Sequence, residues 1–473
     1  MVGQVNILSK RGVMSPTISN NMPHLFAFII LALITLIMGV WVGRKQNNEG
    51  YNLYNRAMRK RTFAVSYAAT FIGAGFFITG TAYAYQFGLG LVWFFLGLLF
   101  GVIIFGFFSR WLKEQTKDNK LYTLPDVFRW RLGKGAARTV TVVTLVLLLG
   151  DIAIQLISGG KLLASLGIMP YAYSILLTTG VIAVYLLVSG FRAVVLTDYL
   201  LTGAMIVLTA IITGYSGKYF APVAEQLNIF SVPLSITIGF FVFGLFGPFA
   251  IATYYQRIFA ADTPTTAQRG TWLSSAPILL TGAGLLIIGI AAKKLFPSID
   301  PDLAFLRIIQ TGGPTIALVG ALVLWSALMD TVDTLVFAGS QILIRDLGGY
   351  ALTKRNVRIG IIVLLGLGVA LSFALPSVTK VALLFLGASM TVAPSAFFLW
   401  CMKRLRGEVV VISIITGLLS LLSYTFSKGI TPQGVGVSFF SALFTLLLGQ
   451  LIFSFNVIWK RRKMLSNKNP SLP

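Results

Sequence analysis

The chain has 473 residues, of which 56% are hydrophobic and only 11% are charged, and its mean hydropathy is +0.85. Because ordinary soluble domains carry roughly a quarter charged residues, this composition predicts an integral membrane protein and excludes an enzyme with a large soluble catalytic lobe. The net charge of +24 comes from Lys and Arg residues between apolar stretches, where they signal membrane topology rather than nucleic-acid binding.

Thirteen apolar stretches are long enough to cross a bilayer as helices, since a crossing needs about 20 residues. They lie at about 26–43, 63–84, 87–109, 137–160, 171–190, 193–214, 233–256, 272–296, 314–344, 357–375, 378–402, 409–427 and 433–457. The first lacks a small-residue cleavage site, so we expect a retained anchor helix. With the N-terminus outside, 29 of the 38 Lys and Arg residues fall in inside segments and 9 in outside segments. This asymmetry predicts an N-outside, C-inside topology, and we expect a bacterial inner membrane.

Two of the predicted helices are interrupted by glycine or proline. The second contains Gly73 and Gly75 on either side of an alanine, and the seventh contains Gly239, Gly244, Gly247 and Pro248. Such residues either allow close helix packing or mark a break that faces a cavity. Two interrupted helices five positions apart predict an inverted repeat of five plus five helices with a site at the membrane midplane.

The loop between the third and fourth predicted helices contains a short helical pattern from Tyr122 to Arg131. Thr123 is a suitable N-cap residue, and Pro125 suits the first helical turn. The following Arg and Trp residues are typical of a headgroup region. We therefore expect a short amphipathic helix at the membrane interface, with a structural role.

Four of the fourteen acidic residues lie inside apolar stretches, namely Asp151, Asp198, Asp330 and Asp333. A carboxylate in the membrane interior is costly unless it is paired, protonated or hydrated. Basic residues are nearly confined to helix ends, so the sequence predicts that internal ion pairs do not neutralise these acids. With one Cys and one His, a zinc site of the usual kind is excluded, and cations or protons from solution are the expected partners.

The ninth predicted helix presents oxygen ligands on one face. Ala327, Asp330, Thr331 and Thr334 share that face at spacings of three and four, and Asp333 lies beside it. Carboxylate and hydroxyl oxygens suit a small hard cation such as sodium better than a transition metal. The alternative is that these acids face a hydrated vestibule and bind nothing specific.

Several sequence blocks resemble the sodium:solute symporter family in order and spacing. They are Tyr122-Thr123-Leu124-Pro125-Asp126, Gly159-Gly160-Lys161-Leu162-Leu163, Ser189-Gly190-Phe191-Arg192 with Thr197-Asp198, Gln256-Arg257 with Ala267-Gln268-Arg269-Gly270, and Asp330-Thr331-Val332-Asp333-Thr334 with Arg345-Asp346-Leu347. The resemblance implies an all-α membrane fold of the LeuT-like type, with one extra N-terminal and two extra C-terminal helices. It implies four parts: 1–62 with the tail, first helix and basic loop, 63–216 and 217–402 as the two repeats, and 403–473 with the last two helices and a basic tail.

The resemblance also implies where the ligands bind. A sodium site would use the backbone carbonyls of Ala69, Ile72 and Ala327, the Thr331 hydroxyl, and Asp330, where the family normally has serine. A second sodium site would use Asp198, Asp330, Asp333 and Thr334. Expected solute contacts, chosen from helix faces, are Phe76, Phe77, Thr79, Asp151, Gln155 and Thr253. An ionised Asp151 favours an amine-bearing or zwitterionic solute over a simple anion.

We therefore expect a sodium-coupled symporter, not an enzyme, that carries a small organic solute by alternating access. Amino acids, carboxylates and vitamin-like solutes are favoured over sugars, because the resemblance places Gly75 and Phe76 at positions that carry polar sugar contacts in the sugar carriers of the family. A proton-coupled carrier that uses Asp330 and Asp333 is the first alternative, and a symporter-like sensor is the second. Expected partners are the solute, sodium and lipid, without nucleic acid, in a monomer or loose oligomer.

Overall fold

The computed structural model describes residues 18–43, 47–116, 118–220, 228–230, 232–375 and 377–468. Across those residues every regular element is a helix, and the only β-type pairing is an isolated bridge between Met58 and Ala261. The all-α fold implied by the family resemblance is therefore confirmed.

The first half of the fold comprises α1 (Ile18–Gly43), α2 (Asn48–Leu53), η2 (Tyr54–Arg56), α3 (Lys60–Phe71), α4 (Ala74–Phe87), η3 (Gly88–Leu91), α5 (Val92–Gln115), α6 (Leu124–Leu132), α7 (Lys134–Ser165), α8 (Tyr171–Val188) and α9 (Phe191–Gly217). The second half comprises α11 (Leu234–Ala250), α12 (Ala252–Ala260), α13 (Pro264–Leu295), η4 (Pro301–Leu303), α14 (Ala304–Thr311), α15 (Gly313–Gln341), η5 (Ile342–Leu347), α16 (Lys354–Ala374), α17 (Val378–Met390), α18 (Ala393–Cys401), α19 (Gly407–Lys428) and α20 (Pro432–Lys468).

Length and hydropathy suit ten of the described helices to crossing a membrane, or eleven if the bent pair α11 and α12 forms one span. In this count α4 and α5 form a single stretch, and the apolar part of α1, Phe26–Val42, is too short to be included. Each of the thirteen predicted stretches overlaps at least one helix. The number of crossings nevertheless stays a prediction.

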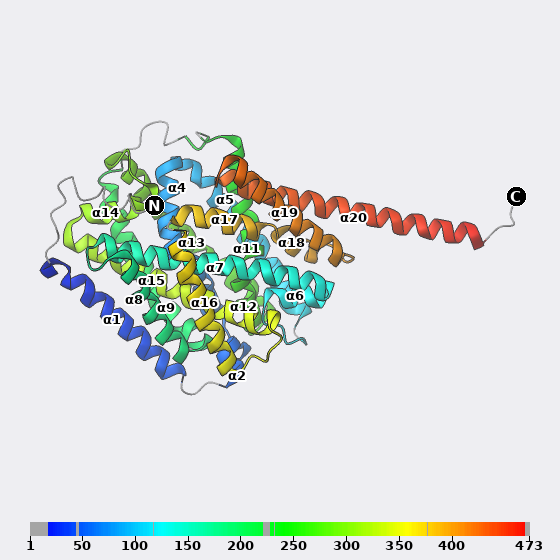
Figure 1. Ribbon diagram of the computed structural model, residues 1–473, viewed down its shortest axis with the longest axis horizontal. Helices are drawn as coiled ribbons and strands as arrows, with labels where there is room; N and C mark the ends of the chain where they lie inside the picture. Colours follow the sequence, from blue (N-terminus) through cyan, green and yellow to red (C-terminus); the bar gives the residue numbers. More distant parts are fainter. Residues whose placement is uncertain are drawn as a thin grey trace.

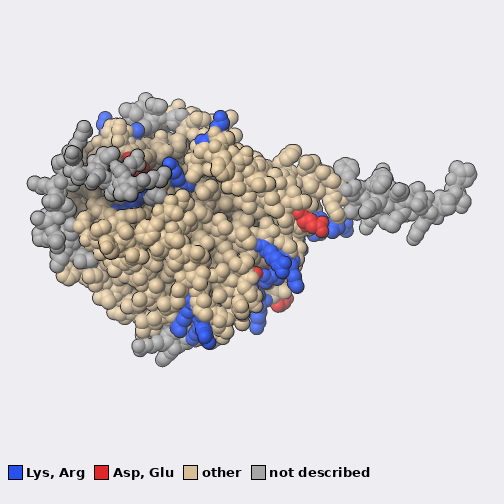
Figure 2. Space-filling model, viewed as in Figure 1, with Lys and Arg blue, Asp and Glu red and all other residues tan. Residues whose placement is uncertain are grey.

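The central helices are the most buried. In α7, 78% of the most apolar window is buried inside the protein, against 28% in α19. Figure 1 shows α1 along one side of the body and α20 extending away from it. Large apolar side chains on the outer helices are exposed, such as Trp41 of α1 at 78% and Phe426 of α19 at 89%. On the face in Figure 2, which is mostly uncharged, Lys and Arg gather near α2 and α6. Exposed apolar side chains on a mostly uncharged face are typical of a perimeter that faces lipid.

The first interrupted helix breaks between α3 and α4, where Ile72 and Gly73 leave the helical conformation. A Cβ atom on Gly73 would lie 2.7 Å from Thr331 Oγ1 and 3.0 Å from Gln155 Nε2. Glycine at this position therefore lets the break lie directly against α7 and α15.

The second break lies at Ile251, where α11 and α12 meet at an angle of 47°. The sequence suggested an interruption at the glycines and Pro248, but α11 continues through all of them. Gly244 packs against α5 instead, because an added Cβ would come within 2.3 Å of the Phe94 carbonyl oxygen. The glycine thus serves close helix packing, and the break follows Pro248.

The short helix expected after the third span is present as α6. Thr123 caps it by accepting a hydrogen bond from the Asp126 N–H at 3.3 Å. Leu124 to Phe128 are buried within the protein, and the position of this helix at a lipid interface stays a prediction. Asp126 forms ion pairs with Arg345 at 2.7 Å and with Arg129 at 3.3 Å. These contacts fasten α6 to the end of the helix that carries the ion-site candidates.

A second buried ion pair fastens α7 to the start of α17. Asp302, in η4, pairs with Lys161 at 3.0 Å and accepts hydrogen bonds from the Val378 and Thr379 N–H groups at 2.9 and 3.3 Å. Burial raises the pKa of the Asp302 carboxyl, but the Lys161 ammonium and these hydrogen bonds outweigh burial and hold the pKa below its usual value. The ionised carboxylate therefore stabilises the folded state.

Replacing Asp302 with Asn is expected to lower the free energy of unfolding by about 1.5–3 kcal/mol, the range for hydrogen bonds to a charged group. Because the folded pKa lies below the unfolded value, the stabilisation is present above the unfolded pKa of about 3.9 and is lost as the pH falls through the folded pKa. Thermal unfolding of the unmodified protein and the variant in detergent, at neutral pH and at pH values below the pKa of the unfolded carboxyl, measures this difference in stability. A stability difference that does not shrink in acid would contradict the assignment.

Candidate functional site

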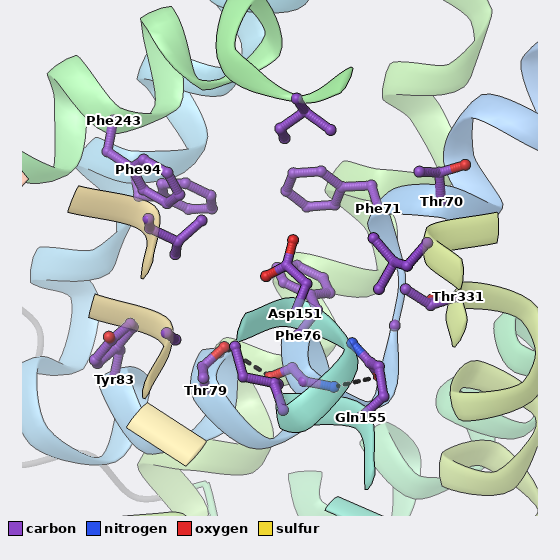
Figure 3. A pocket seen from close by; sticks show the side chains of 18 of the residues that line it. Thr70, Phe71, Phe76, Thr79, Tyr83, Phe94, Asp151, Gln155, Phe243 and Thr331 are labelled. Atoms are coloured by element: carbon purple, nitrogen blue, oxygen red, sulfur yellow. Dashed lines mark hydrogen bonds between the residues drawn. The ribbon is translucent and has the colours of Figure 1, made fainter. Parts of the chain in front are cut away.

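A cavity of about 150 Å³ lies between the two broken helices and their neighbours α5, α7, α15 and α17. Its lining comprises Thr70, Phe71, Gly73, Gly75, Phe76, Thr79, Gly80, Tyr83, Leu91, Phe94, Phe95, Asp151, Ile154, Gln155, Phe240, Phe243, Ile251, Thr253, Tyr254, Thr331, Leu335, Ala382 and Leu386. Figure 3 shows Asp151 and Gln155 from α7 and Thr331 from α15 on its walls. Such a volume accommodates a ligand of roughly the size of benzene.

Hydrogen bonds join the first helix break to α7 and α15. The Gly75 N–H donates to Gln155 Oε1 at 3.1 Å, and the Thr331 hydroxyl donates to the Ala69 carbonyl oxygen at 3.4 Å. The break therefore brings backbone groups of α3 and α4 next to side chains from two distant helices. Residues separated by more than 250 positions in the sequence meet at one point.

The structure places the five residues predicted for the first sodium site as follows. Ala69 and Thr331 are in direct contact, and Ile72 lies at the break itself. Ala327 and Asp330 lie on α15, and both are fully buried. Backbone carbonyls at a helix break and hydroxyl or carboxylate oxygens are the hard ligands that suit a small cation.

Asp198, Asp330 and Asp333 form a buried acidic cluster between α9 and α15. Their exposed fractions are 0%, 0% and 1%, and Asp198 interacts electrostatically with both of the others. The Thr202 hydroxyl donates to Asp330 Oδ2 at 3.3 Å. Within the described residues, Asp330 Oδ1, Asp333 Oδ1 and both Asp198 oxygens lack a hydrogen bond of normal geometry, although Ser66 lies within interaction range of Asp198. Buried carboxyl oxygens without donors are costly, so the cluster is suited to a cation or a proton.

Among the described residues no ion pair joins a Lys or Arg to these acids, as predicted, but one basic residue that the sequence placed elsewhere lies beside them. Arg257, which the sequence placed in an inside loop, is 0% exposed on α12. Its guanidinium donates to the Ser66 carbonyl oxygen at 3.2 Å and to Thr334 Oγ1 at 2.8 Å. It interacts electrostatically with all three acids. The cluster therefore contains one fixed positive charge.

Arg257 was not expected in the interior because the seventh predicted helix ended at Gln256. The structure continues that broken span as α12, in which every residue from Ala252 to Ala260 is buried. The extended Ile251 redirects the chain into the protein instead of out to a loop. A signal was available, since an apolar stretch continues for four residues beyond Arg257, up to Asp262.

The residues predicted for a second sodium site lie next to this guanidinium. Thr334 accepts a hydrogen bond from Arg257, and Asp198 and Asp333 lie within its electrostatic range. In the part of the chain that the structure describes, no group of three or more His, Cys, Asp or Glu side chains is arranged to hold a metal ion. A second cation at Thr334 would approach a positive charge at close range.

Five of the six predicted solute contacts line the cavity: Phe76, Thr79, Asp151, Gln155 and Thr253. Phe77 does not, because it is 0% exposed on the other side of α4 and packs against Phe305 of α14 at 5.6 Å between ring centroids. Most of the aromatic lining, which comes from α3, α4, α5, α11 and α12, was not predicted from the sequence. Its aromatic residues lie in ordinary apolar stretches, where nothing in the sequence separates cavity walls from core.

Curated relatives cover a large part of this chain. It is 23% identical over 320 residues to a sodium/pantothenate symporter of Haemophilus influenzae, covering 63% of this chain and 65% of that protein. A sodium/pantothenate symporter of Escherichia coli is 24% identical over 354 residues, covering 67% of this chain and 71% of that protein. The high-affinity choline transporter 1 of Drosophila melanogaster is 24% identical, with 58% of this chain and 46% of that protein covered.

Solved structures share the fold. A Na⁺-coupled sialic acid symporter in a substrate-bound outward-open state superposes with a TM-score of 0.75 at 15% identity, over 90% of this chain and 97% of that chain. A nucleobase-cation-symport-1 family transporter superposes with a TM-score of 0.59 at 12% identity, over 86% and 95% of the two chains. The LeuT-like fold expected from the resemblance is thereby confirmed. A model of the sodium:solute symporter family matches residues 51–402, which is most of the chain, and the protein therefore belongs to the sodium:solute symporter family.

Proposed function

We propose that this protein is a secondary active transporter that moves sodium and a small organic solute together by alternating access. One observation carries the proposal: Thr331 lines the cavity, and its hydroxyl bonds to the Ala69 carbonyl oxygen at the helix break. An ion bound at this junction contacts the same elements that form the cavity wall. Ion and solute then favour one conformation, and each raises the affinity for the other by the same factor.

The sodium ligands in this proposal are the carbonyl oxygens of Ala69, Ile72 and Ala327, the Thr331 hydroxyl, and Asp330. The Asp330 carboxylate adds a negative charge where the family normally has a neutral hydroxyl. A full charge strengthens cation binding in a buried site. One sodium ion per cycle is the favoured stoichiometry, because Arg257 already supplies a positive charge beside Thr334.

In this proposal the two repeats, 63–216 and 217–402, rock against each other around the site. The flanking parts, 1–62 and 403–473, lie outside the moving core. The N-terminus is outside and the C-terminus in the cytoplasm of a bacterial inner membrane, as the distribution of Lys and Arg favours. A monomer is sufficient for the mechanism, since both broken helices come from one chain.

Proton coupling is a second candidate, favoured by Asp330 Oδ1 and both Asp198 oxygens, which have no hydrogen-bond partner among the described residues. Protonation removes the cost of a buried charge as effectively as cation binding does. The two candidates differ in their need for sodium, since a proton-coupled carrier transports its solute without it. The fold and the cavity would be the same in either case.

Uptake into proteoliposomes separates these candidates. Labelled proline, choline and pantothenate are supplied under an inward sodium gradient at fixed pH and membrane potential, and in parallel under an inward proton gradient with potassium replacing sodium. We expect accumulation of at least one probe under the sodium gradient alone. Accumulation under the proton gradient without sodium would support the second candidate. Equal flux with and without sodium in every arm would sink the proposal.

A further inference from the structure

The cavity contains a carboxylate that the proposed ion site does not use. Asp151 extends from α7 into the cavity, where Figure 3 shows its carboxyl directed into the open space with the rings of Phe71, Phe94 and Phe243 around it. In the described part of the chain, no N–H or O–H group donates to this carboxyl, and no Lys or Arg forms an ion pair with it. A partly enclosed carboxylate without a protein partner is suited to a ligand that brings its own positive charge.

The charge on the cavity lining is negative only. Asp151 is the only charged residue among those that line it, and neither Lys, Arg nor His contributes to the lining as described. The buried cation Arg257 of α12 donates to Ser66 and Thr334 and is not among the residues that line the cavity. An anionic solute would therefore bring a second negative charge into an enclosed space without a counter-charge.

The walls around Asp151 are aromatic. The rings belong to Phe71, Phe76, Tyr83, Phe94, Phe95, Phe240, Phe243 and Tyr254. Neighbouring rings are in contact, with centroid distances of 4.9 Å for Phe71 and Phe76 and 5.3 Å for Phe94 and Phe243. The faces of such rings are electron-rich and attract cations, as in the aromatic cages that bind quaternary ammonium groups. Carboxylate and rings thus favour the same kind of ligand.

Polar groups suited to a hydroxyl-rich solute are few. The hydroxyls of Thr79 and Thr70 donate to the backbone of their own helices, and Gln155 Oε1 already accepts from Gly75. The Tyr83 and Thr253 hydroxyls have no partner among the described residues. A sugar or polyol would leave many of its hydroxyls unpaired in this cavity, at a cost in affinity. The lining favours a compact solute that is mostly apolar around one charged group.

We propose that the solute is a small organic molecule with a positively charged nitrogen, which binds between the Asp151 carboxylate and the aromatic rings of the cavity. This inference rests on the proposed transport function, whose ion site is separate from Asp151. The nitrogen belongs to an amine, a quaternary ammonium or the ammonium end of a zwitterion. The shared chemistry is the positive nitrogen, and the experiment distinguishes these sources.

The test uses probes of matched shape and different charge. Choline is compared with its neutral carbon isostere 3,3-dimethylbutan-1-ol, with the zwitterion trimethylglycine, with proline, and with the anion pantothenate. Stabilisation of the purified protein against thermal unfolding, in sodium chloride and in potassium chloride, gives an affinity for each probe. We expect cationic or zwitterionic probes to bind at least about tenfold more tightly than the neutral isostere, a difference of about 1.4 kcal/mol.

The Asp151→Asn variant is expected to abolish this preference, bringing the affinities for choline and its isostere within about threefold of each other, or about 0.7 kcal/mol. Stabilisation by sodium without any solute should persist in this variant, which shows that it folds and keeps its ion site. Equal binding of the neutral isostere by the unmodified protein overturns the proposal, and so does binding of pantothenate alone or of no probe. Sodium stabilisation with uptake of a solute that has no positively charged nitrogen leaves the transport function standing and refutes the inference. Binding of a cationic probe without any effect of sodium would support the inference and contradict sodium coupling.

Discussion

Replacing Asp330 with Ala is expected to reduce sodium-driven accumulation of solute by more than about tenfold, a loss of at least about 1.4 kcal/mol of coupling. Asp330 lies one residue from Thr331, whose hydroxyl bonds to the Ala69 carbonyl oxygen at the helix break. One of its oxygens accepts from Thr202 while the other has no partner in the described residues. The variant removes this charged ligand and leaves the hydroxyl of Thr331. Initial uptake and final accumulation in proteoliposomes under a sodium gradient measure the loss.

Two control variants make this result specific. Asp330→Ser restores the residue that the family normally carries and is expected to retain sodium-driven uptake. Asp262→Ala removes an exposed carboxylate from the loop before α13 and is expected to change nothing. Sodium-driven accumulation near that of the unmodified protein in Asp330→Ala would exclude Asp330 from the ion site.

Replacing Arg257 with Met is expected to lower the free energy of unfolding by about 3–5 kcal/mol, the range for leaving a buried charge without its partner. The guanidinium is fully buried and donates to Ser66 and Thr334. Met has a similar length but no charge, so the acidic cluster loses its fixed cation while the packing volume is nearly kept. We also expect sodium to stabilise this variant more than the unmodified protein, because an added cation then meets uncompensated carboxylates. Thermal unfolding in detergent, with sodium or potassium chloride, measures both effects.

The matched control is Arg269→Met, which removes an exposed arginine from α13 and is expected to alter the melting temperature little. In the Arg257→Met background, Asp198→Asn is expected to recover part of the lost stability, because it removes one of the stranded negative charges. If the losses of stability in the two single variants simply add in the double variant, Arg257 acts through packing and hydrogen bonds instead of through the charge of the cluster.

Glycines pointed to the position of one helix break correctly and to the position of the other incorrectly. The break at Gly73 was indicated by two closely spaced glycines, and the structure has the break there, where an added Cβ would approach Thr331 and Gln155 too closely. In the seventh span the same kind of signal was misleading, because Gly244 allows α5 to approach while the chain breaks later at Ile251. Glycine has the same appearance in a sequence whether it permits a break or a close contact. Only the neighbouring helix distinguishes the two.

By itself, the sequence determined the membrane class, the helical fold, the acids in the interior and the family resemblance. These follow from composition, from the length of apolar stretches and from residues at short spacings, which are properties of the chain alone. The tertiary structure decided that Arg257 joins the acidic cluster, that Phe77 faces away from the cavity and that aromatic rings surround Asp151. These features depend on which faces of distant helices meet, because burial, charge compensation and the shape of a cavity are produced by packing between segments far apart in the sequence.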